Sequence, residues 1–227
     1  MLLTALCQNV MRATGYTAPS TFIGNTSPDA RRMVAIVNQA GVQLARQPWR
    51  RLTAEATVSV SVTSIYALPS DFSEVVNNTI WNRTDDTESY GPLTEQEWQR
   101  QKGSGITTYA SPEWRLTKDK QLELLSPPSA TEVWVLEYRS SNWVVDTSSS
   151  ATAALWSSST ERTALDETLL ELDLTWRWLR AKGMDYQTEY LEFRRLFDDE
   201  IARDKGGSKK LNLRGEVVID TVTDVGL

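Results

Sequence analysis

Residues 165–186, LDETLLELDLTWRWLRAKGMDY, decide the fold of this chain. Apolar side chains recur on one helical face at positions 165, 169, 172, 176 and 179, and on a second face at positions 170, 174 and 178. An apolar surface this wide predicts a helix that is buried on more than one side. The sequence Lys182-Gly183-Met184-Asp185 then predicts a break, because glycine favours helix ends.

Further helices are expected on both sides of this one. Downstream, an aromatic and aliphatic stripe at positions 186, 190, 193, 197 and 201 predicts a helix that closes at Gly206-Gly207. Near the start, residues 2–14 show helical spacing and stop at Gly15, and Ser27-Pro28 begins a second helix that ends before Pro48. None of these helices can bury its stripe alone, so we expect them to pack into one bundle.

The middle of the chain changes to a period of two, which indicates strands. Val58, Val60 and Val62 alternate with Thr and Ser, and further strands are expected at 75–81, 114–117, 121–125 and 132–138. Residues 118–120 would form a hairpin turn, and Thr94 with Glu97 has the capping-box spacing of a short helix over 94–102. Residues 147–160, TSSSATAALWSSST, are interpreted as a linker or flexible loop.

The predicted fold class is therefore α+β, with a helical bundle formed by N- and C-terminal helices, an inserted β-rich subdomain and an extended C-terminal arm. The expected segments are the N-terminal helices (1–52), the β-rich insertion (53–146), a Ser/Thr-rich loop (147–164), the C-terminal helices (165–207) and the arm (208–227).

Composition removes several classes of chemistry. The chain has 227 residues, 24 Lys and Arg, 30 Asp and Glu, no His and a single Cys, Cys7. Histidine-dependent triads and histidine metal sites are excluded, and one cysteine forms neither an intrachain disulfide nor a thiolate zinc site. No run approaches the roughly 18 apolar residues of a membrane span. Carboxylate or lysine chemistry remains, or no chemistry at all.

Short motifs add no cofactor or metal site. The glycines around 103–105 and 206–207 lack the spacing of a phosphate loop. Acidic clusters occur at Asp85-Asp86 with Glu88 and at Asp198-Asp199-Glu200, and we interpret both as solvated faces. Of the nine Trp residues, those at 134, 176 and 178 are expected in the core. The others pack in satellite contacts or anchor interfaces.

The charge is distributed unevenly. Residues 1–52 hold six basic side chains against the single Asp29, a net charge of +5, whereas residues 53–164 hold 8 basic and 15 acidic ones, a net charge of −7. The basic side chains could contact an acidic neighbouring subunit, bind DNA or line a solvated helix face. The six candidate subunit-interface residues are Arg12, Arg31, Arg32, Arg46, Arg50 and Arg51.

The last residues, SKKLNLRGEVVIDTVTDVGL at 208–227, have no helical period and no core of their own. We interpret them as an arm that becomes ordered against a partner, for instance by strand addition. The alternative is an edge strand that returns to the chain's own sheet. The apolar residues of the arm that would bind the partner are Leu211, Leu213, Val217, Val218 and Ile219.

An ordered set of short motifs carries a resemblance. The motifs are YALPSDF at 66–72, PL at 92–93 before Glu97-Trp98, LLSPP at 124–128, LEYR at 136–139 before Trp143-Val144, WRW at 176–178 and AKGMDY at 181–186. In this order they resemble the head-to-tail adaptor proteins of short-tailed bacteriophages, also called head-completion or tail tubular adaptor proteins. The resemblance extends from residue 2 to about residue 205.

This resemblance implies a structural role in the virion, with the host cytoplasm as the place of assembly. Such adaptors form a dodecameric ring under the portal after DNA packaging, extend the channel through which double-stranded DNA passes, and support the tail nozzle or tail tube. The implied partners are thus the portal protein, a tail protein and further copies of the chain, without a membrane, a cofactor or an enzymatic activity. The alternative function is a cell-wall glycan hydrolase using an Asp/Glu pair.

Overall fold

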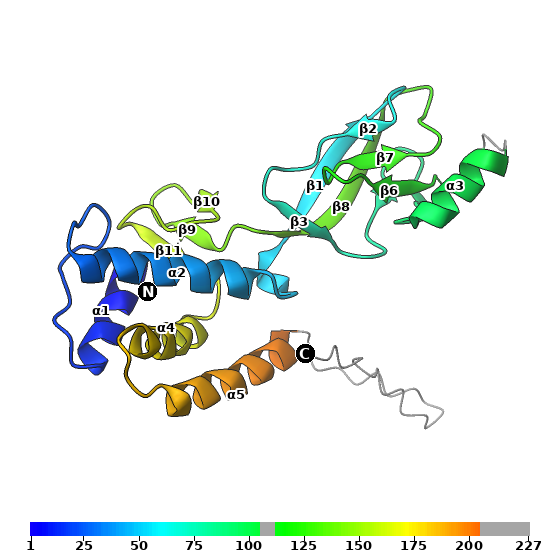
Figure 1. The fold of residues 1–227 in the computed structure, drawn as a ribbon. Helices are drawn as coiled ribbons and strands as arrows, with labels where there is room; N and C mark the ends of the chain where they lie inside the picture. Colours follow the sequence, from blue (N-terminus) through cyan, green and yellow to red (C-terminus); the bar gives the residue numbers. More distant parts are fainter. Residues whose placement is uncertain (105–111, 205–227) are drawn as a thin grey trace.

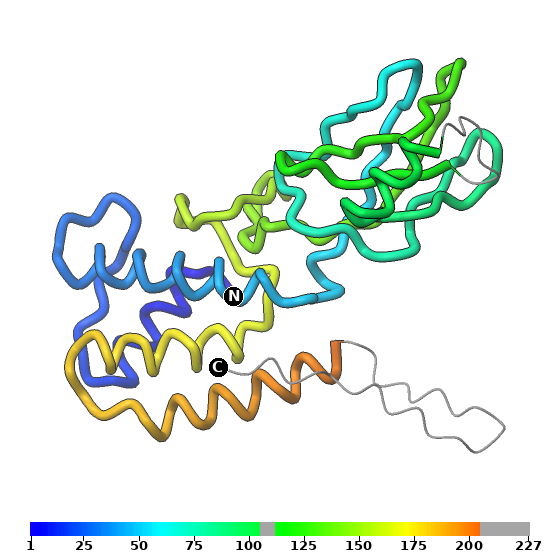
Figure 2. Tube along the Cα trace, turned by 45° about the vertical axis from the view of Figure 1, so that its right-hand side comes forward, coloured from blue at the N-terminus to red at the C-terminus, as the bar shows by residue number. Residues whose placement is uncertain are grey.

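The structure of the protein is a computed structural model, which describes residues 1–104 and 112–204. The elements form two lobes (Figure 1). One lobe holds four helices and a small sheet, and the other, the β-lobe, holds two sheets and a short helix. Figure 2 shows the same two lobes after a 45° rotation, joined where α2 leads into the first long strand. The expected α+β class is confirmed.

The helices have clear bounds within the described residues. They are α1 (Leu3–Ala13), α2 (Pro28–Ala45), α3 (Glu95–Ser104), α4 (Glu167–Ala181) and α5 (Gln187–Asp204), with a 3-10 turn η1 (Arg50–Leu52). Three expected helix boundaries are confirmed, the C-terminal ends of α1 and α4 and the start of α2. Gly15 follows α1 at φ +80°, the Ser27 hydroxyl accepts a hydrogen bond from Ala30 N (3.2 Å), and Gly183 follows α4 at φ +71°. The expected end of the last helix at residues 206–207 lies outside the described residues.

The largest sheet is built around one central strand, β8 (Glu132–Ser140). On one side β8 pairs antiparallel with β1 (Thr53–Val60), and on the other with β3 (Phe72–Val75) and β4 (Trp81–Asn82), which continues to β5 (Thr87–Glu88). A second sheet in the same lobe has the order β2 (Ile65–Tyr66), β7 (Leu122–Leu124), β6 (Trp114–Leu116). The hairpin turn expected at residues 118–120 joins β6 to β7.

The strand expected over 75–81 is wrong. β3 ends at Val75 and β4 begins only at Trp81. Asn78 between them takes φ +61°, and the Thr79 hydroxyl donates to Val76 O (2.6 Å) while it accepts from Glu137 N (3.1 Å). An Asn-Asn-Thr sequence supports a turn through such side-chain bonds, and this local chemistry outweighs the apolar pattern around it.

The segment expected to be a linker or flexible loop, residues 147–160, is instead built into the helical lobe. It contains β10 (Thr152–Ala153), which joins a three-stranded sheet with β9 (Val144–Asp146) and β11 (Glu161–Thr163). Trp156 is 3% exposed and donates from Nε1 to Ser158 O (2.6 Å), and Trp143 Nε1 donates to Ala154 O (2.7 Å). Two buried indoles therefore hold a stretch whose Ser/Thr composition is typical of a linker.

Each lobe has its own hydrophobic cluster. The helical cluster joins α1, α2, α4, the small sheet and Phe193 of α5. The β-lobe cluster lies between its two sheets and includes Trp114, Trp134 and Tyr138. α4 packs against α1, α2 and α5, so both of its predicted apolar faces are covered. The residue boundaries of the expected segments stay a prediction.

Candidate assembly surfaces

The last described turn of α5 is tied to η1, between the two lobes. The Arg51 guanidinium lies 3.7 Å from Asp204, 3.8 Å from Glu200 and 4.0 Å from Asp166, and Arg50 N donates to Asp204. The Asp204 and Glu200 side chains are only 9% and 10% exposed, so these ion pairs are partly shielded from water. The C-terminal end of α5 is therefore held next to the start of β1. The predicted arm residues lie beyond that point, outside the described residues.

An aromatic cluster holds the rest of α5. Phe193 lies between Trp176 of α4 (ring centroids 6.3 Å apart) and Phe197 (5.7 Å), and the Phe197 ring meets Trp49 edge-on at 6.2 Å. Trp49 in turn donates from Nε1 to Leu44 O (2.7 Å) at the end of α2. The predicted stripe of the last helix thus docks on α4 at one end and on the segment before η1 at the other.

The six arginines of the predicted subunit interface do not form one patch. Arg51 belongs to the ion-pair cluster, and Arg32 donates to Ala181 O (3.1 Å) at the end of α4. Arg31 and Arg46 lie near opposite ends of α2, roughly 22 Å apart at 1.5 Å rise per residue. Arg12, Arg31, Arg46 and Arg50 are exposed, and within residues 1–104 and 112–204 their side chains form no ion pair.

The acidic clusters noted in the sequence hold local structure. Asp85 accepts from Asn82 Nδ2 (3.2 Å) and Asp86 accepts from Trp81 Nε1 (3.2 Å). Glu200 pairs with Arg203 (2.8 Å) in addition to Arg51. Among the described residues, no group of three or more Cys, Asp or Glu side chains is arranged to hold a metal ion.

One carboxylate is fully buried in the helical lobe. Asp173 of α4 accepts hydrogen bonds from Trp176 Nε1 (2.8 Å) and Arg177 Nε (2.9 Å), and Arg177 also donates to Gln43 of α2 (2.7 Å). Burial raises the pKa of Asp173, against the opposing effect of the Arg177 charge. The arrangement links α4 to α2 and lies in the core, so we assign it a structural role.

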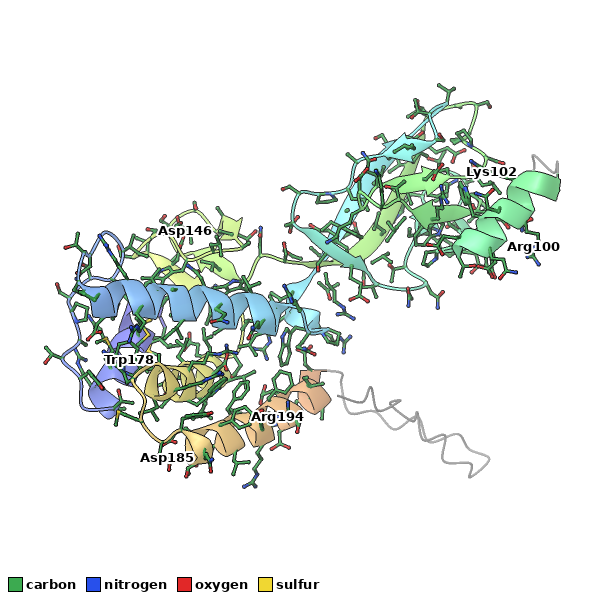
Figure 3. All side chains as sticks on the ribbon, in the orientation of Figure 1. Arg100, Lys102, Asp146, Trp178, Asp185 and Arg194 are labelled. Carbon is green, nitrogen blue, oxygen red and sulfur yellow. The ribbon has the colours of Figure 1, made fainter. Side chains whose placement is uncertain are left out.

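The only cysteine is equally enclosed. Cys7 is fully buried in α1, and this burial raises the pKa of its thiol. A thiol that stays protonated is a poor nucleophile. Figure 3 shows the same lobe with its side chains, and the labelled Trp178, also fully buried, lies among the helices.

Eight of the nine indoles are buried. Trp134, Trp176 and Trp178 are in the core as predicted, and of the six with less constrained positions only Trp81, on β4, is exposed, at 39%. Of the other five, Trp49, Trp143, Trp156 and Trp114 belong to the two hydrophobic clusters themselves rather than to satellite contacts, and Trp98 is buried in α3 outside both clusters.

Among the described residues of the β-lobe, the most exposed large apolar side chain is Val62, whose alternation with Val58 and Val60 had predicted a strand. Val62, in the connection between β1 and β2, is 71% exposed, and Ile65, the first residue of β2, is 46% exposed. We call residues 61–65 and 125–131, which adjoin at the end of the lobe, the tip. The two segments meet because Leu124 N donates to Ser64 O (2.8 Å) and Val60 pairs with Glu132. The available signal was a run without charged residues from 56 to 70.

None of the helices in the described parts of the chain is both long and apolar enough to cross a bilayer.

The model of the family described as SU10 adaptor protein matches residues 1–216, and so includes both lobes and the beginning of the C-terminal segment. No curated protein matches the sequence.

Proposed function

The chain belongs to the SU10 adaptor protein family, and from this premise we propose that it forms a ring under the portal that carries the tail. Family membership makes it a structural adaptor of a bacteriophage virion that takes part in tail assembly and contacts other virion components such as portal and tail proteins. The finer statement, a dodecameric ring that docks after DNA packaging and extends the DNA channel, is our proposal. The observation that carries it is the family match over nearly the whole chain.

We assign the portal contact to the C-terminal segment. The support is the position of the last described residue, Asp204, which is bound to Arg50 and Arg51 beside η1. From there, residues 208–227 could extend to a second protein without disturbing either lobe. The apolar side chains proposed to bind the portal are those at positions 211, 213, 217, 218 and 219.

Deleting residues 208–227 tests this assignment. The truncated chain should keep the wild-type thermal unfolding transition and lose binding to the purified portal of its phage. A matched pair of full-length variants sharpens the test: Leu211→Asp with Leu213→Asp should abolish binding, whereas Asn212→Ala with Arg214→Ala should retain it. Loss of folding on truncation would instead place the segment in the subunit's own sheet, and portal binding by the truncated chain would also contradict the assignment.

Neighbouring subunits are proposed to meet through charge. A closed ring uses two different surfaces on each subunit, and the unpaired arginines of α1 and α2 would meet the acidic β-lobe of the next copy. Reversing Arg31 and Arg46 to Glu should slow ring formation on the portal several-fold at low salt, and the difference from wild type should shrink at high salt. Unchanged assembly kinetics of this variant at low salt would refute the charge contact.

The proposed role does not include hydrolysis of the cell wall. The adaptor family supports a structural role, and the acidic residues noted in the sequence are used in local hydrogen bonds and ion pairs or are exposed. Purified chain incubated with peptidoglycan should release soluble fragments no faster than buffer. Release above that level, abolished by a single Asp or Glu substitution, would contradict this part of the proposal.

A further inference from the structure

α3 is attached to the β-lobe through few contacts. It lies at the end of that lobe away from the helical lobe, beside β6 (Figure 1). Trp98, at 1% exposure, is the only buried residue of its ten, and Glu97 and Gln101 are half-buried while the others are exposed. A helix this short is marginal on its own and takes its stability from the face that it buries. For α3 that face is one indole and the polar side chains around it.

The surroundings of Trp98 are charged and polar rather than apolar. The guanidinium of Arg115 on β6 lies over the Trp98 ring, 4.3 Å from its centroid. The ammonium of Lys102, labelled on α3 in Figure 3, lies 5.4 Å from the centroid of the same ring. Gln101 Nε2 donates a hydrogen bond to Glu113, which directly precedes β6 (3.0 Å). Trp98 is thus held between cations, and it belongs to neither hydrophobic cluster.

Docking of α3 leaves buried polar atoms without partners. Six of the nine indoles donate from Nε1 to a protein acceptor, whereas Trp98 Nε1, like those of Trp114 and Trp178, has no hydrogen-bond partner within residues 1–104 and 112–204. Glu113 is 7% exposed, and its Oε1 accepts from Gln101 while its Oε2 is buried without a partner in the same described ranges. A buried polar atom of this kind regains a hydrogen bond when water reaches it. The contact that holds α3 is therefore opposed by the groups that it encloses.

The Glu113 carboxyl makes this contact sensitive to pH. Burial raises the pKa of Glu113 above its ordinary value of 4.5, against the hydrogen bond from Gln101 and the charge of Arg100. The docked state therefore binds the Glu113 proton more tightly than an open state, and docking weakens as the pH rises from about 4.5 towards the raised pKa. The other charged or titratable groups at this contact are Glu97 and Lys102 of α3, Arg115 of β6 with its partner Glu123 of β7 (2.6 Å), and Tyr90, whose backbone pairs with that of Glu113.

The rest of the β-lobe is held together without α3. Its hydrophobic cluster lies between the two sheets and includes Trp114 but not Trp98. The chain before α3 is anchored separately, because Leu93 is buried and its N donates to Trp114 O (2.9 Å). We propose that α3 is a detachable helix, which leaves the β-lobe as a unit while both sheets stay folded, with the Glu113 carboxyl as its pH-sensitive contact. This opening exposes Trp98 and does not depend on the proposed adaptor function.

Hydrogen exchange of the full chain, followed by mass spectrometry and corrected for intrinsic exchange rates, tests the opening. At neutral pH the backbone amides of residues 98–104 should be protected at least roughly 100-fold less than those of β1 and β8, because local opening requires less free energy than global unfolding. Trp98→Ala should abolish the protection of residues 98–104 and leave that of β1 and β8 within about two-fold of wild type. Equal protection of α3 and β8 in the wild-type chain would overturn the inference, as would loss of protection in β1 and β8 of Trp98→Ala.

A matched pair of variants tests the carboxyl. Glu113→Gln keeps an acceptor for Gln101 without the charge, so at neutral pH it should raise the protection of residues 98–104 several-fold and remove its dependence on pH. Glu95→Gln makes the same change at an exposed position of α3 and should follow wild type within about two-fold at every pH. A Glu113→Gln chain with the wild-type pH profile in α3 would overturn the assignment of Glu113 as the pH-sensitive contact.

Discussion

Phe193 is a single side chain on which the position of α5 depends. It is 7% exposed and is one of only two buried residues in that helix, the other being Glu200. Its ring contacts Trp176 and Phe197, so removing it opens a gap in the aromatic cluster that joins α5 to α4.

Phe193→Ala should lower the free energy of unfolding by about 3–5 kcal/mol, the cost of deleting a buried aromatic ring. Leu191→Ala, two residues away and 67% exposed, is the control and should change stability by less than about 0.5 kcal/mol. Urea denaturation followed by tryptophan fluorescence measures both. Equal effects of the two substitutions would contradict the assignment of the buried face.

Asp173 predicts a pH dependence of stability. Its pKa is raised in the folded protein above its ordinary value of 3.8, so the folded state holds the proton more tightly than the unfolded state. Stability must then fall as the pH rises from about 3.8 towards the raised folded pKa, and Asp173 disfavours the folded state above that window.

Asp173→Asn removes this titration and preserves an acceptor for Trp176 and Arg177. The free energy of unfolding of the variant, measured by urea denaturation across acid to neutral pH, should therefore rise relative to wild type as the pH increases through that window. All other groups titrate in both proteins and cancel in the difference. Parallel pH profiles would show that the Asp173 pKa is not raised.

At the scale of elements, α2 approaches Trp143 closely at Gly41. A Cβ added at Gly41 would lie 2.1 Å from Trp143 Cε2, so no side chain fits there. The helix needs a glycine at this point although glycine weakens helices in general. Trp143, which directly precedes β9 of the small sheet, is thereby seated on α2.

Gly41→Ala should destabilise the protein by about 3 kcal/mol or more, because neither the helix backbone nor the fixed indole can yield easily. Gly103→Ala in α3 is the matched control, since nothing lies within 4 Å of the added Cβ. The control should be neutral or stabilising by up to about 1 kcal/mol. Thermal melting of both variants measures the two changes in stability. If Gly41→Ala were as mild as the control, the close approach of α2 to Trp143 would be contradicted.

Element prediction succeeded where periodicity and end signals agreed. The capping box of Thr94 and Glu97 is present, with Thr94 N donating to Glu97 Oε2 (2.9 Å) and Glu97 N donating to Thr94 Oγ1 (3.3 Å). It failed at 147–160, where Trp156 N donates to Asn38 Oδ1 of α2 (2.7 Å) and Trp143 Nε1 donates to Ala154 O (2.7 Å), because no local pattern reports such contacts. Exposure of Val62 was equally invisible, since its alternation with Val58 and Val60 suggests burial.

At the scale of the whole molecule, the candidate surfaces depend on how the two lobes are placed. The sequence places six arginines in one basic region, but folding uses Arg32 and Arg51 within the subunit and separates the others. The net charge of each region follows from the sequence alone. Which arginines are bound within the subunit does not, because the partners of Arg32 and Arg51 are brought to them by the packing of α4 and α5. The surfaces left over, the unpaired arginines and the uncharged tip, lie on different lobes.

The central claim, assembly on a portal, is tested most directly by mass photometry of the purified chain, alone and mixed with the portal of its phage. We expect the chain alone to have the mass of a monomer, and the mixture to show the portal with a closed ring of copies added. A portal whose mass is unchanged by the chain would contradict the claim.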